Sequence, residues 1–306
     1  MKLARYMSDH GPRIGIVVDE RLVDVQQLGY RLEVEGILEG GLDLWSRMSA
    51  DARADGRLPV PIDSLELLAP VSQPSKYFAV GMNTRDHLAE VSGGTTARAQ
   101  SAHRRNQLVA QAYPDPRFAM IFNKQVSCIS GPHSPIWLPR KSTFLDYEGE
   151  VAVVIGRRLR DADESAARAA IAGYVVANDV SVRDWQTTTS QAWLGKSFDT
   201  HGPIGPWIVT ADEFDPASAE IRTWVNGELR QSGTLADQIL SPWAIVSQIS
   251  QVCTLEPGDL IATGTPAGVG AVQEKWLTLG DRVRVQVTGI GVIENEVVAE
   301  PSAEGR

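Results

Sequence analysis

The sequence predicts an α+β fold rich in β-strands, with a small N-terminal α/β module over residues 1–70 and a larger domain over residues 71–306. Short apolar runs separated by strong turn signals dominate the chain after a proline-rich stretch, 58–74. These runs do not alternate regularly with helical patterns, which disfavours a doubly wound or (β/α)8 architecture. The proline-rich stretch indicates a connection between the two parts.

The N-terminal module is expected to contain a hairpin followed by a helix. Residues 13–18 and 22–25 are apolar runs on either side of a charged turn, a pattern typical of two paired strands. Residues 28–48 have a weaker pattern that favours a helix.

Strands account for most of the larger domain. Residues 221–231 predict a β-hairpin with Asn226 and Gly227 at its tip, where positive φ is tolerated. Further strands are expected at residues 144–155, 174–177, 260–263, 282–287 and 290–293.

Two helices are expected in the same domain. Residues 163–172 are alanine-rich, start with acidic residues and stop at Gly173. Residues 242–252 follow Ser241, a good N-cap, and begin with proline, which suits the first helical position.

Two carboxylates in the predicted strand 144–155 are the first indication of function. Glu148 and Glu150 share one face of this strand, because successive side chains point to opposite faces. The rest of the strand is apolar on both faces, so the strand is expected to be buried. Two buried like charges need compensation, which a divalent cation with oxygen ligands can supply. Asp179, just after the run 174–177, is a third candidate ligand; a solvated strand end with paired glutamates is the simpler alternative.

Composition excludes several classes of function. The net charge of -9 over 306 residues argues against nucleic acid or an anionic membrane as the main partner. No apolar run approaches the roughly 18 residues that span a bilayer, and the first residues lack a signal-peptide pattern, so a cytoplasmic protein is expected. The only cysteines, Cys128 and Cys253, are far apart, which disfavours disulfide scaffolds and zinc–thiolate sites.

Five motifs occur in a fixed order along the chain: 80–90, 144–155, 179–186, 193–206 and 262–270. Over about residues 77–298 this set resembles the fumarylacetoacetate hydrolase superfamily, in the branch of acylpyruvases and 2-hydroxyhepta-2,4-diene-1,7-dioate isomerases that carry a small N-terminal domain. The resemblance implies a mixed β-sandwich roll and a homodimer. It also implies Mg²⁺ or Mn²⁺, with Ca²⁺ as a further candidate, bound by Glu148, Glu150 and Asp179.

The resemblance also implies substrate-binding and catalytic residues around that metal. Lys196 resembles a lysine that faces the metal, although a surface lysine is the ordinary interpretation of its loop. Arg183 and Gln186 resemble substrate-contacting residues, and Arg183 is equally compatible with a structural ion pair to Asp184 or another carboxylate. Thr265 is the candidate contact for a substrate carboxylate. Its glycine-rich segment lacks the Gly-Lys-Ser/Thr ending of a P-loop, which excludes that motif.

A histidine and a glutamate in the first motif suggest a general base. His87 and Glu90 are three residues apart and would share one face of a helix, where the carboxylate can orient the imidazole and raise its basicity. The resemblance places them in a catalytic lid, about residues 82–117, where such a pair activates water; a surface pair is the alternative. Residues 96–110 are expected to form a helix, which is a movable cover, a constitutive surface helix or a dimer contact. His201 is a rival base that is expected to be structural.

The predicted activity is metal-dependent hydrolysis of a carbon–carbon bond in a 1,3-dicarbonyl compound, such as an acylpyruvate or a fumarylacetoacetate-like substrate. A metal-stabilised enolate is the expected intermediate. Decarboxylation of oxaloacetate and isomerisation of an unsaturated 2-oxo diacid use the same enolate chemistry and remain alternatives. A non-catalytic small-molecule binder is the alternative from another class. The expected partner is a small oxo-acid or diketone substrate.

Overall fold

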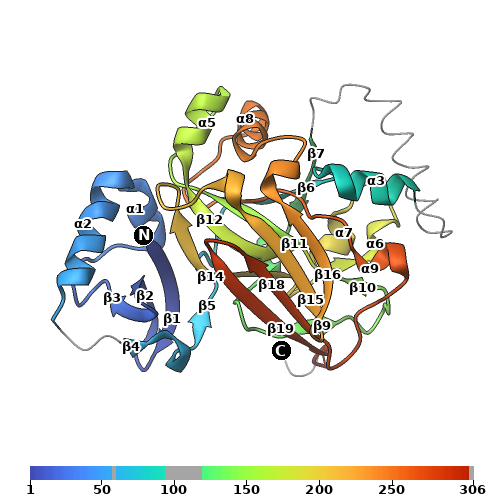
Figure 1. Ribbon diagram of the computed structural model, residues 1–306, viewed down its shortest axis with the longest axis horizontal. Coiled ribbons are helices and arrows are strands. Elements are labelled where there is room, and N and C mark those ends of the chain that lie inside the picture. Colours follow the sequence, from blue (N-terminus) through green and yellow to red (C-terminus); the bar gives the residue numbers. More distant parts are fainter. Residues whose placement is uncertain (57–59, 94–118, 303–306) are drawn as a thin grey trace.

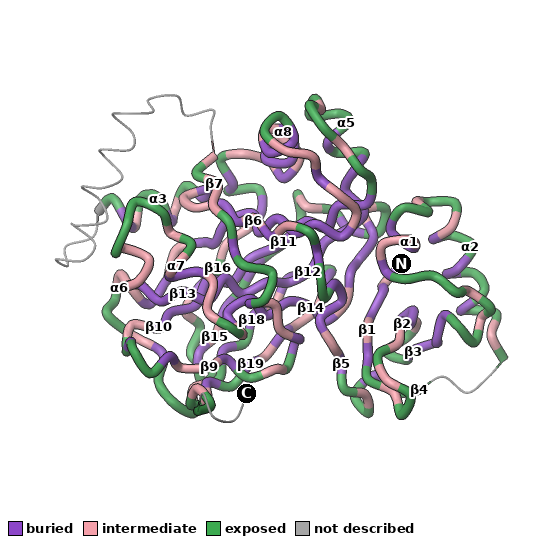
Figure 2. Tube along the Cα trace, turned by 180° about the vertical axis from the view of Figure 1, so that it is seen from behind, coloured by how far each residue is buried: buried purple, intermediate pink, exposed green. Residues whose placement is uncertain are grey.

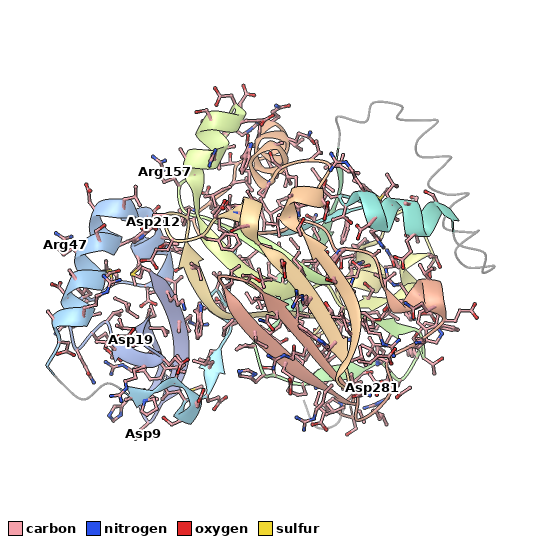
Figure 3. All side chains as sticks on the ribbon, viewed as in Figure 1. Asp9, Asp19, Arg47, Arg157, Asp212 and Asp281 are labelled. Carbon is pink, nitrogen blue, oxygen red and sulfur yellow. The ribbon has the colours of Figure 1, made fainter. Side chains whose placement is uncertain are left out.

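The computed structural model describes residues 1–56, 60–93 and 119–302. It confirms the predicted α+β class: Figure 1 shows a small N-terminal unit of strands and two helices beside a larger body dominated by strands. Charged side chains such as Asp9, Arg47 and Arg157 lie at the periphery (Figure 3). In the described part of the chain, none of the helices is long and apolar enough to cross a membrane.

The strands fall into one large sheet, a smaller sheet and a short two-stranded pair. Their bounds are β1 Lys2–Ser8, β2 Gly11–Val18, β3 Arg21–Asp24, β4 Val60–Pro61, β5 Leu67–Leu68, β6 Tyr77–Gly81, β7 Met120–Lys124, β8 Ile129–Ser130, β9 Ile136–Leu138, β10 Leu145–Asp146, β11 Gly149–Ile155, β12 Ile171–Asn178, β13 Ser181–Val182, β14 Gly202–Thr210, β15 Glu220–Val225, β16 Glu228–Thr234, β17 Leu260–Ala262, β18 Arg282–Val287 and β19 Gly291–Ala299.

The helices are short and lie mostly around the sheets (Figure 1). Their bounds are α1 Val34–Glu39, α2 Gly41–Ala54, α3 Arg85–Gly93, α5 Glu164–Ala170, α6 Arg183–Gln186, α7 Trp193–Lys196, α8 Pro242–Val252 and α9 Gly270–Gln273.

The large sheet runs continuously from the N-terminal strands into the larger domain. Its order is β4-β3-β2-β1-β14-β12-β11-β17-β6-β7, and β1 joins the two parts by antiparallel pairing with β14. The smaller sheet has the order β16-β15-β18-β19-β9. The division at residue 70 stays a prediction, since a shared sheet does not show where each part would fold on its own.

Strand β11 is buried on both faces, as its apolar sequence predicts (Figure 2). Val151, Val153 and Ile155 belong to a core that also contains residues of β15, β18 and α8. Ala152 and Val154 belong to a second core, which includes residues of the N-terminal strands and helices. Strand β11 is therefore packed against two cores, and the segments at its end start from a buried position.

Several predicted elements are confirmed. The hairpin 221–231 forms as β15 and β16, with positive φ at both Asn226 and Gly227. Helix α8 has the predicted bounds, and the Ser241 side chain accepts a hydrogen bond from the backbone N–H of Ala244. The first hairpin, β2 and β3, also forms where the sequence predicts it.

Three predicted elements need correction. The helix expected over 28–48 is two helices, α1 and α2, separated at Gly40–Gly41, where Gly41 has a φ of +61°. The helix expected over 163–172 ends at Ala170, because Ile171 already has extended dihedral angles and starts β12. The strand expected over 144–155 is broken at residues 147–148 into β10 and β11, which pair with different strands. The helix expected over 96–110 lies outside the described residues.

Candidate active site

The three predicted carboxylates meet at one end of β11 and β12. The antiparallel register pairs Gly149 with Asn178, so the residues just beyond these positions are brought together. The backbone N–H of Asp179 donates to the carbonyl of Glu148 at 2.8 Å. One carboxylate oxygen from each of Glu148, Glu150 and Asp179 lies within 4.8 Å of the others, and all three residues are buried.

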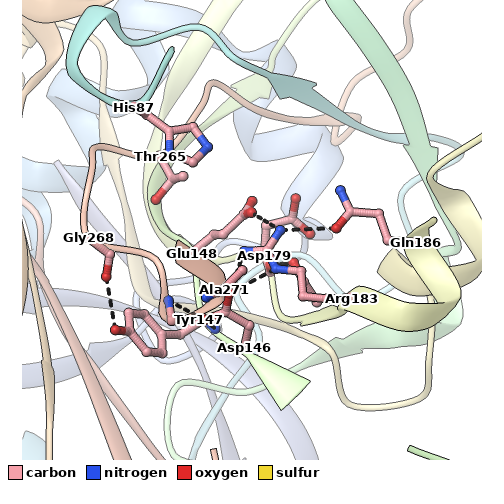
Figure 4. A network of polar contacts seen from close by, with 12 residues as sticks. His87, Asp146, Tyr147, Glu148, Asp179, Arg183, Gln186, Thr265, Gly268 and Ala271 are labelled. Atoms are coloured by element: carbon pink, nitrogen blue, oxygen red, sulfur yellow. Dashed lines mark hydrogen bonds and ion pairs between the residues drawn. The ribbon is translucent and has the colours of Figure 1, made fainter. Parts of the chain in front are cut away.

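Two predicted cations contact this group directly. Lys196 Nζ lies 2.6 Å from Glu148 Oε2 and 2.8 Å from Asp179 Oδ2. Arg183 Nη1 lies 2.6 Å from Glu148 Oε1 and donates to Gln186 Oε1 at 3.1 Å, as Figure 4 shows. The structure thus places Lys196 in the site and not on the surface.

The electrostatic environment shifts the pKa values of Glu148 and Glu150 in opposite directions. Burial alone would raise the pKa of Glu148, but the charges of Lys196 and Arg183 outweigh it and lower this pKa to about 2. Burial raises the pKa of Glu150 well above its ordinary value, and the charges of Asp179 and Glu148 raise it further. Glu150 is the carboxylate with the least compensation, and its Oε2 accepts a hydrogen bond from the backbone N–H of Gly264 at 2.7 Å.

Arg183 also forms an ion pair with Asp146. Its Nε donates to Asp146 Oδ2 at 2.8 Å, and the same carboxylate accepts from the backbone N–H groups of Gly270 and Ala271 (Figure 4). The structural ion pair considered for Arg183 therefore exists, with Asp146 and Glu148 as partners, whereas Asp184 accepts from Ser142.

Lys196 reaches the carboxylates because α7 packs closely on α6. A Cβ on Gly195 would lie 2.3 Å from the backbone nitrogen of Gln186, so only glycine permits this approach. Glycine at position 195 therefore allows the close spacing of α6 and α7 that places the Lys196 ammonium beside the carboxylates.

The glycine-rich loop after β17 closes another side of the site. Gly264 has a φ of +110°, and this backbone conformation directs its N–H to Glu150. Thr265 Oγ1 donates to the carbonyl of Gly149 at 2.9 Å and accepts from Gln231 Nε2 at 2.8 Å. The Thr265 hydroxyl thus joins the loop to β11 and β16, and its contact with a substrate stays a prediction.

His87 and Glu90 form the predicted pair on α3. His87 Nδ1 lies 3.2 Å from Glu90 Oε2, and Figure 4 shows the imidazole above Glu148, on the side away from Tyr147 and Asp146. The Glu90 carboxylate accepts from the backbone N–H of Gly268 at 3.0 and 3.1 Å. Asp86 accepts from the backbone N–H of Ala267, so two carboxylates hold α3 against the glycine-rich loop.

Residues just before α3 strengthen this attachment. Asn83 Nδ2 donates to the carbonyl of Thr263, and Thr84 Oγ1 donates to the carbonyl of Thr265 at 2.6 Å.

His201 has the structural role expected for it. Its imidazole is fully buried, one ring nitrogen contacts the carbonyl oxygen of Trp137 at 2.8 Å, and burial lowers its pKa to about 3. The ring is therefore neutral, with Nε2–H donating to Trp137.

Two buried residues of the site were missed from the sequence. Asp146 holds Arg183, and Lys124 at the end of β7 holds Asp179 by a contact of 2.6 Å. Asp146 lies in the same segment as Glu148, and this closeness to a predicted metal ligand could have indicated that it belongs to the site. For Lys124, 55 residues before Asp179, no local pattern indicates the partner.

The donor set fits a hard divalent cation. All three converging donors are carboxylates, the ligand type preferred by Mg²⁺ and Mn²⁺. Among the described residues, no lysine or arginine forms an ion pair with Glu150, whose buried charge is the one a cation would compensate. A buried carboxylate group at a sheet end, with a His–Glu pair above it, defines a candidate metal-dependent enzyme site.

Comparison with known proteins identifies the family. Residues 76–298 match the family described as fumarylacetoacetate (FAA) hydrolase C-terminal, and the chain belongs to this family. The chain is 41% identical over 248 residues to the mitochondrial oxaloacetate tautomerase FAHD2B of Bos taurus, covering 79% of this chain and 73% of the relative.

Two solved structures are similar over nearly the whole chain. The fumarylacetoacetate hydrolase of Exiguobacterium antarcticum is 36% identical with a TM-score of 0.80, and the match covers 98% of this chain and all of that one. The maleylpyruvate hydrolase of Sphingobium sp. SYK-6, in complex with manganese(II) ion and pyruvate, is 28% identical with a TM-score of 0.77 and the same coverage. These relatives are enzymes, and both hydrolases share the fold of this chain.

Proposed function

We propose that this chain is a divalent-metal-dependent hydrolase that cleaves a carbon–carbon bond in a 1,3-dicarbonyl acid of the acylpyruvate type. The observation that carries the proposal is the buried carboxylate group Glu148, Glu150 and Asp179 with the His87–Glu90 pair on α3 above it. The maleylpyruvate hydrolase that binds manganese and pyruvate supports the same class of reaction.

Glu148, Glu150 and Asp179 would hold Mg²⁺ or Mn²⁺. When bound, such a cation supplies Lewis-acid stabilisation of negative charge on a 2-oxo acid. Lys196, already between Glu148 and Asp179, adds a second positive charge beside the same oxygens.

His87 is the proposed general base. The contact of Nδ1 with Glu90 assigns the ring proton to Nδ1, which leaves Nε2 to accept a proton from water. The water oxygen then attacks the distal carbonyl carbon of the substrate. The bond between that carbon and the adjacent methylene breaks, which releases a carboxylic acid and leaves the enolate of pyruvate. His87 then returns its proton to the enolate carbon, which gives pyruvate and restores the neutral imidazole.

Arg183 and Gln186 are the proposed substrate-orienting residues. Ion pairs with Asp146 and Glu148 fix the position of Arg183, and its Nη1 donates a hydrogen bond to Gln186 Oε1. Figure 4 shows the amide nitrogen of Gln186 turned away from Arg183, and this nitrogen is the proposed donor to an anionic substrate.

A second candidate is proton transfer on a 2-oxo diacid without an attacking water. The 41% identity to an oxaloacetate tautomerase favours it, because the same pair can move a proton between carbon and oxygen positions of one substrate. Isomerisation of an unsaturated 2-oxo diacid belongs to this group. Decarboxylation of oxaloacetate also needs no attacking water, but it breaks a carbon–carbon bond: carbon dioxide leaves, and the remaining enolate of pyruvate takes up a proton.

One set of assays separates these candidates. Pyruvate release from acetylpyruvate, enol-to-keto conversion of oxaloacetate and carbon dioxide release from oxaloacetate are measured with Mg²⁺ and with a chelator. Hydrolysis predicts metal-dependent pyruvate release as the fastest reaction. Faster conversion of oxaloacetate would support the second candidate, and no turnover of any oxo-acid would leave a binding protein.

A further inference from the structure

Lys124 is a fully buried cation at the end of β7 that the proposed mechanism does not use. Its ammonium lies 2.6 Å from Asp179 Oδ1 and donates to the carbonyl of His201 at 3.0 Å and to the carbonyl of Lys196. An ammonium group has three hydrogens, and these three acceptors use all of them. Lys124 is therefore held in one position and cannot reach solvent or substrate.

Lys124 is linked to Lys196, the proposed catalytic lysine, both directly and through Asp179. Lys124 binds the backbone carbonyl of Lys196, and the Lys196 ammonium returns to Asp179 Oδ2 and Glu148 Oε2. The two oxygens of Asp179 are thus held by two different lysines, which fixes the plane of this carboxylate. The hydrogen bond from Lys124 to the Lys196 carbonyl also holds the backbone from which the Lys196 side chain extends.

We propose that Lys124 is a positioning residue, which orients Asp179 as a metal ligand and places Lys196 beside it. The inference rests on the proposed metal site and assigns to it a residue that neither contacts the metal nor the substrate. Residues that orient metal ligands typically change metal affinity by about 10–100-fold when replaced.

Charge and positioning predict opposite effects on metal affinity. A cation 2.6 Å from a ligand oxygen repels a bound dication, so loss of its charge alone should strengthen metal binding. Loss of orientation should weaken metal binding, because Asp179 would then lose one of its two fixed contacts. The sign of the change therefore distinguishes the two roles.

The test is the dissociation constant of Mn²⁺ for the metal-free protein, measured by titration with electron paramagnetic resonance. Lys124→Met and Lys124→Arg are both expected to weaken Mn²⁺ binding about 10-fold or more, since guanidinium cannot reproduce three contacts made by one ammonium nitrogen. Lys124→Arg keeps the charge and guards against a Lys124→Met variant that fails to fold. Lys76→Met, which removes a lysine paired with Asp259 at 3.0 Å, is the matched control and should bind like the wild type.

Each outcome has one interpretation. Tighter binding by Lys124→Met with unchanged binding by Lys124→Arg would mean that only charge matters and would overturn the proposal. Equal binding by wild type and both variants would overturn it as well, while leaving the proposed function intact. A wild-type protein that binds no Mn²⁺ would remove the metal site, and the role of Lys124 with it.

Discussion

The carboxylate group and the His87–Glu90 pair lie on the same site but are built in different ways. The carboxylates lie at the buried ends of β11 and β12. Ion pairs with Lys124, Lys196 and Arg183 fix Asp179 and Glu148, whereas Glu150 is held by the backbone N–H of Gly264. The pair lies on a nine-residue helix, α3, whose carboxylates contact backbone N–H groups of the glycine-rich loop. Metal binding should therefore depend on the strand ends, whereas proton transfer should depend on α3.

The largest expected effect comes from Glu150→Gln, which removes the least compensated charge. Mn²⁺ binding and turnover should be lost together, because a neutral amide is a poor ligand for a hard cation. The melting temperature of the metal-free protein should rise, since burial and the charges of Asp179 and Glu148 all disfavour an ionised Glu150. Calorimetric titration and thermal unfolding measure both effects; full activity in this variant would remove Glu150 from the site.

His87→Ala should separate the two regions. It should lower kcat by about 10²–10⁴-fold, the usual contribution of a general base, while Mn²⁺ affinity stays within about twofold of wild type. Steady-state kinetics at saturating Mn²⁺ and the same titration provide the comparison. Unchanged kcat would exclude His87 as the base, and a large loss of affinity would show that α3 and the carboxylates are not independent.

Gly195→Ala tests the spacing between α6 and α7. Its Cβ would lie 2.3 Å from Gln186 N, so the helices must separate and carry Lys196 away from Glu148 and Asp179. A displacement near 1 Å should lower kcat by about 10–100-fold. Gly56→Ala, where no atom lies within 4 Å of the added carbon, is the control and should leave kcat unchanged. Wild-type kcat in Gly195→Ala would show that the position of Lys196 is not critical.

Stability at low pH is expected to depend on His201. His201 has a pKa of about 3 in the folded chain and 6.5 ordinarily, so the unfolded chain binds the extra proton between these values. Its contribution to stability is complete above pH 6.5 and falls by about 1.4 kcal/mol per pH unit as the pH drops toward 3. The free energy of unfolding, measured from pH 4 to 7 with denaturant, should decrease less steeply for His201→Gln. Parallel curves would contradict a buried neutral imidazole.

The sequence predicts the parts of this site that follow local rules. Strand alternation selects Glu148 and Glu150, and helical spacing selects His87 and Glu90. Lys124 and Asp146 escape such rules, because their roles depend on which distant strands and loops become neighbours. The same limit explains the break of the predicted strand at residues 147–148: apolar patterning does not show that β10 and β11 pair with different strands.

The proposed metal-dependent function requires Glu148, Glu150 and Asp179 to bind one divalent cation. Anomalous diffraction from a crystal soaked in Mn²⁺ can detect this binding, because the scattering of manganese marks its position independently of activity. We expect a single strong peak among these three carboxylates, and its loss in Glu150→Gln. A peak elsewhere, or no peak in a wild-type crystal at saturating Mn²⁺, would contradict it.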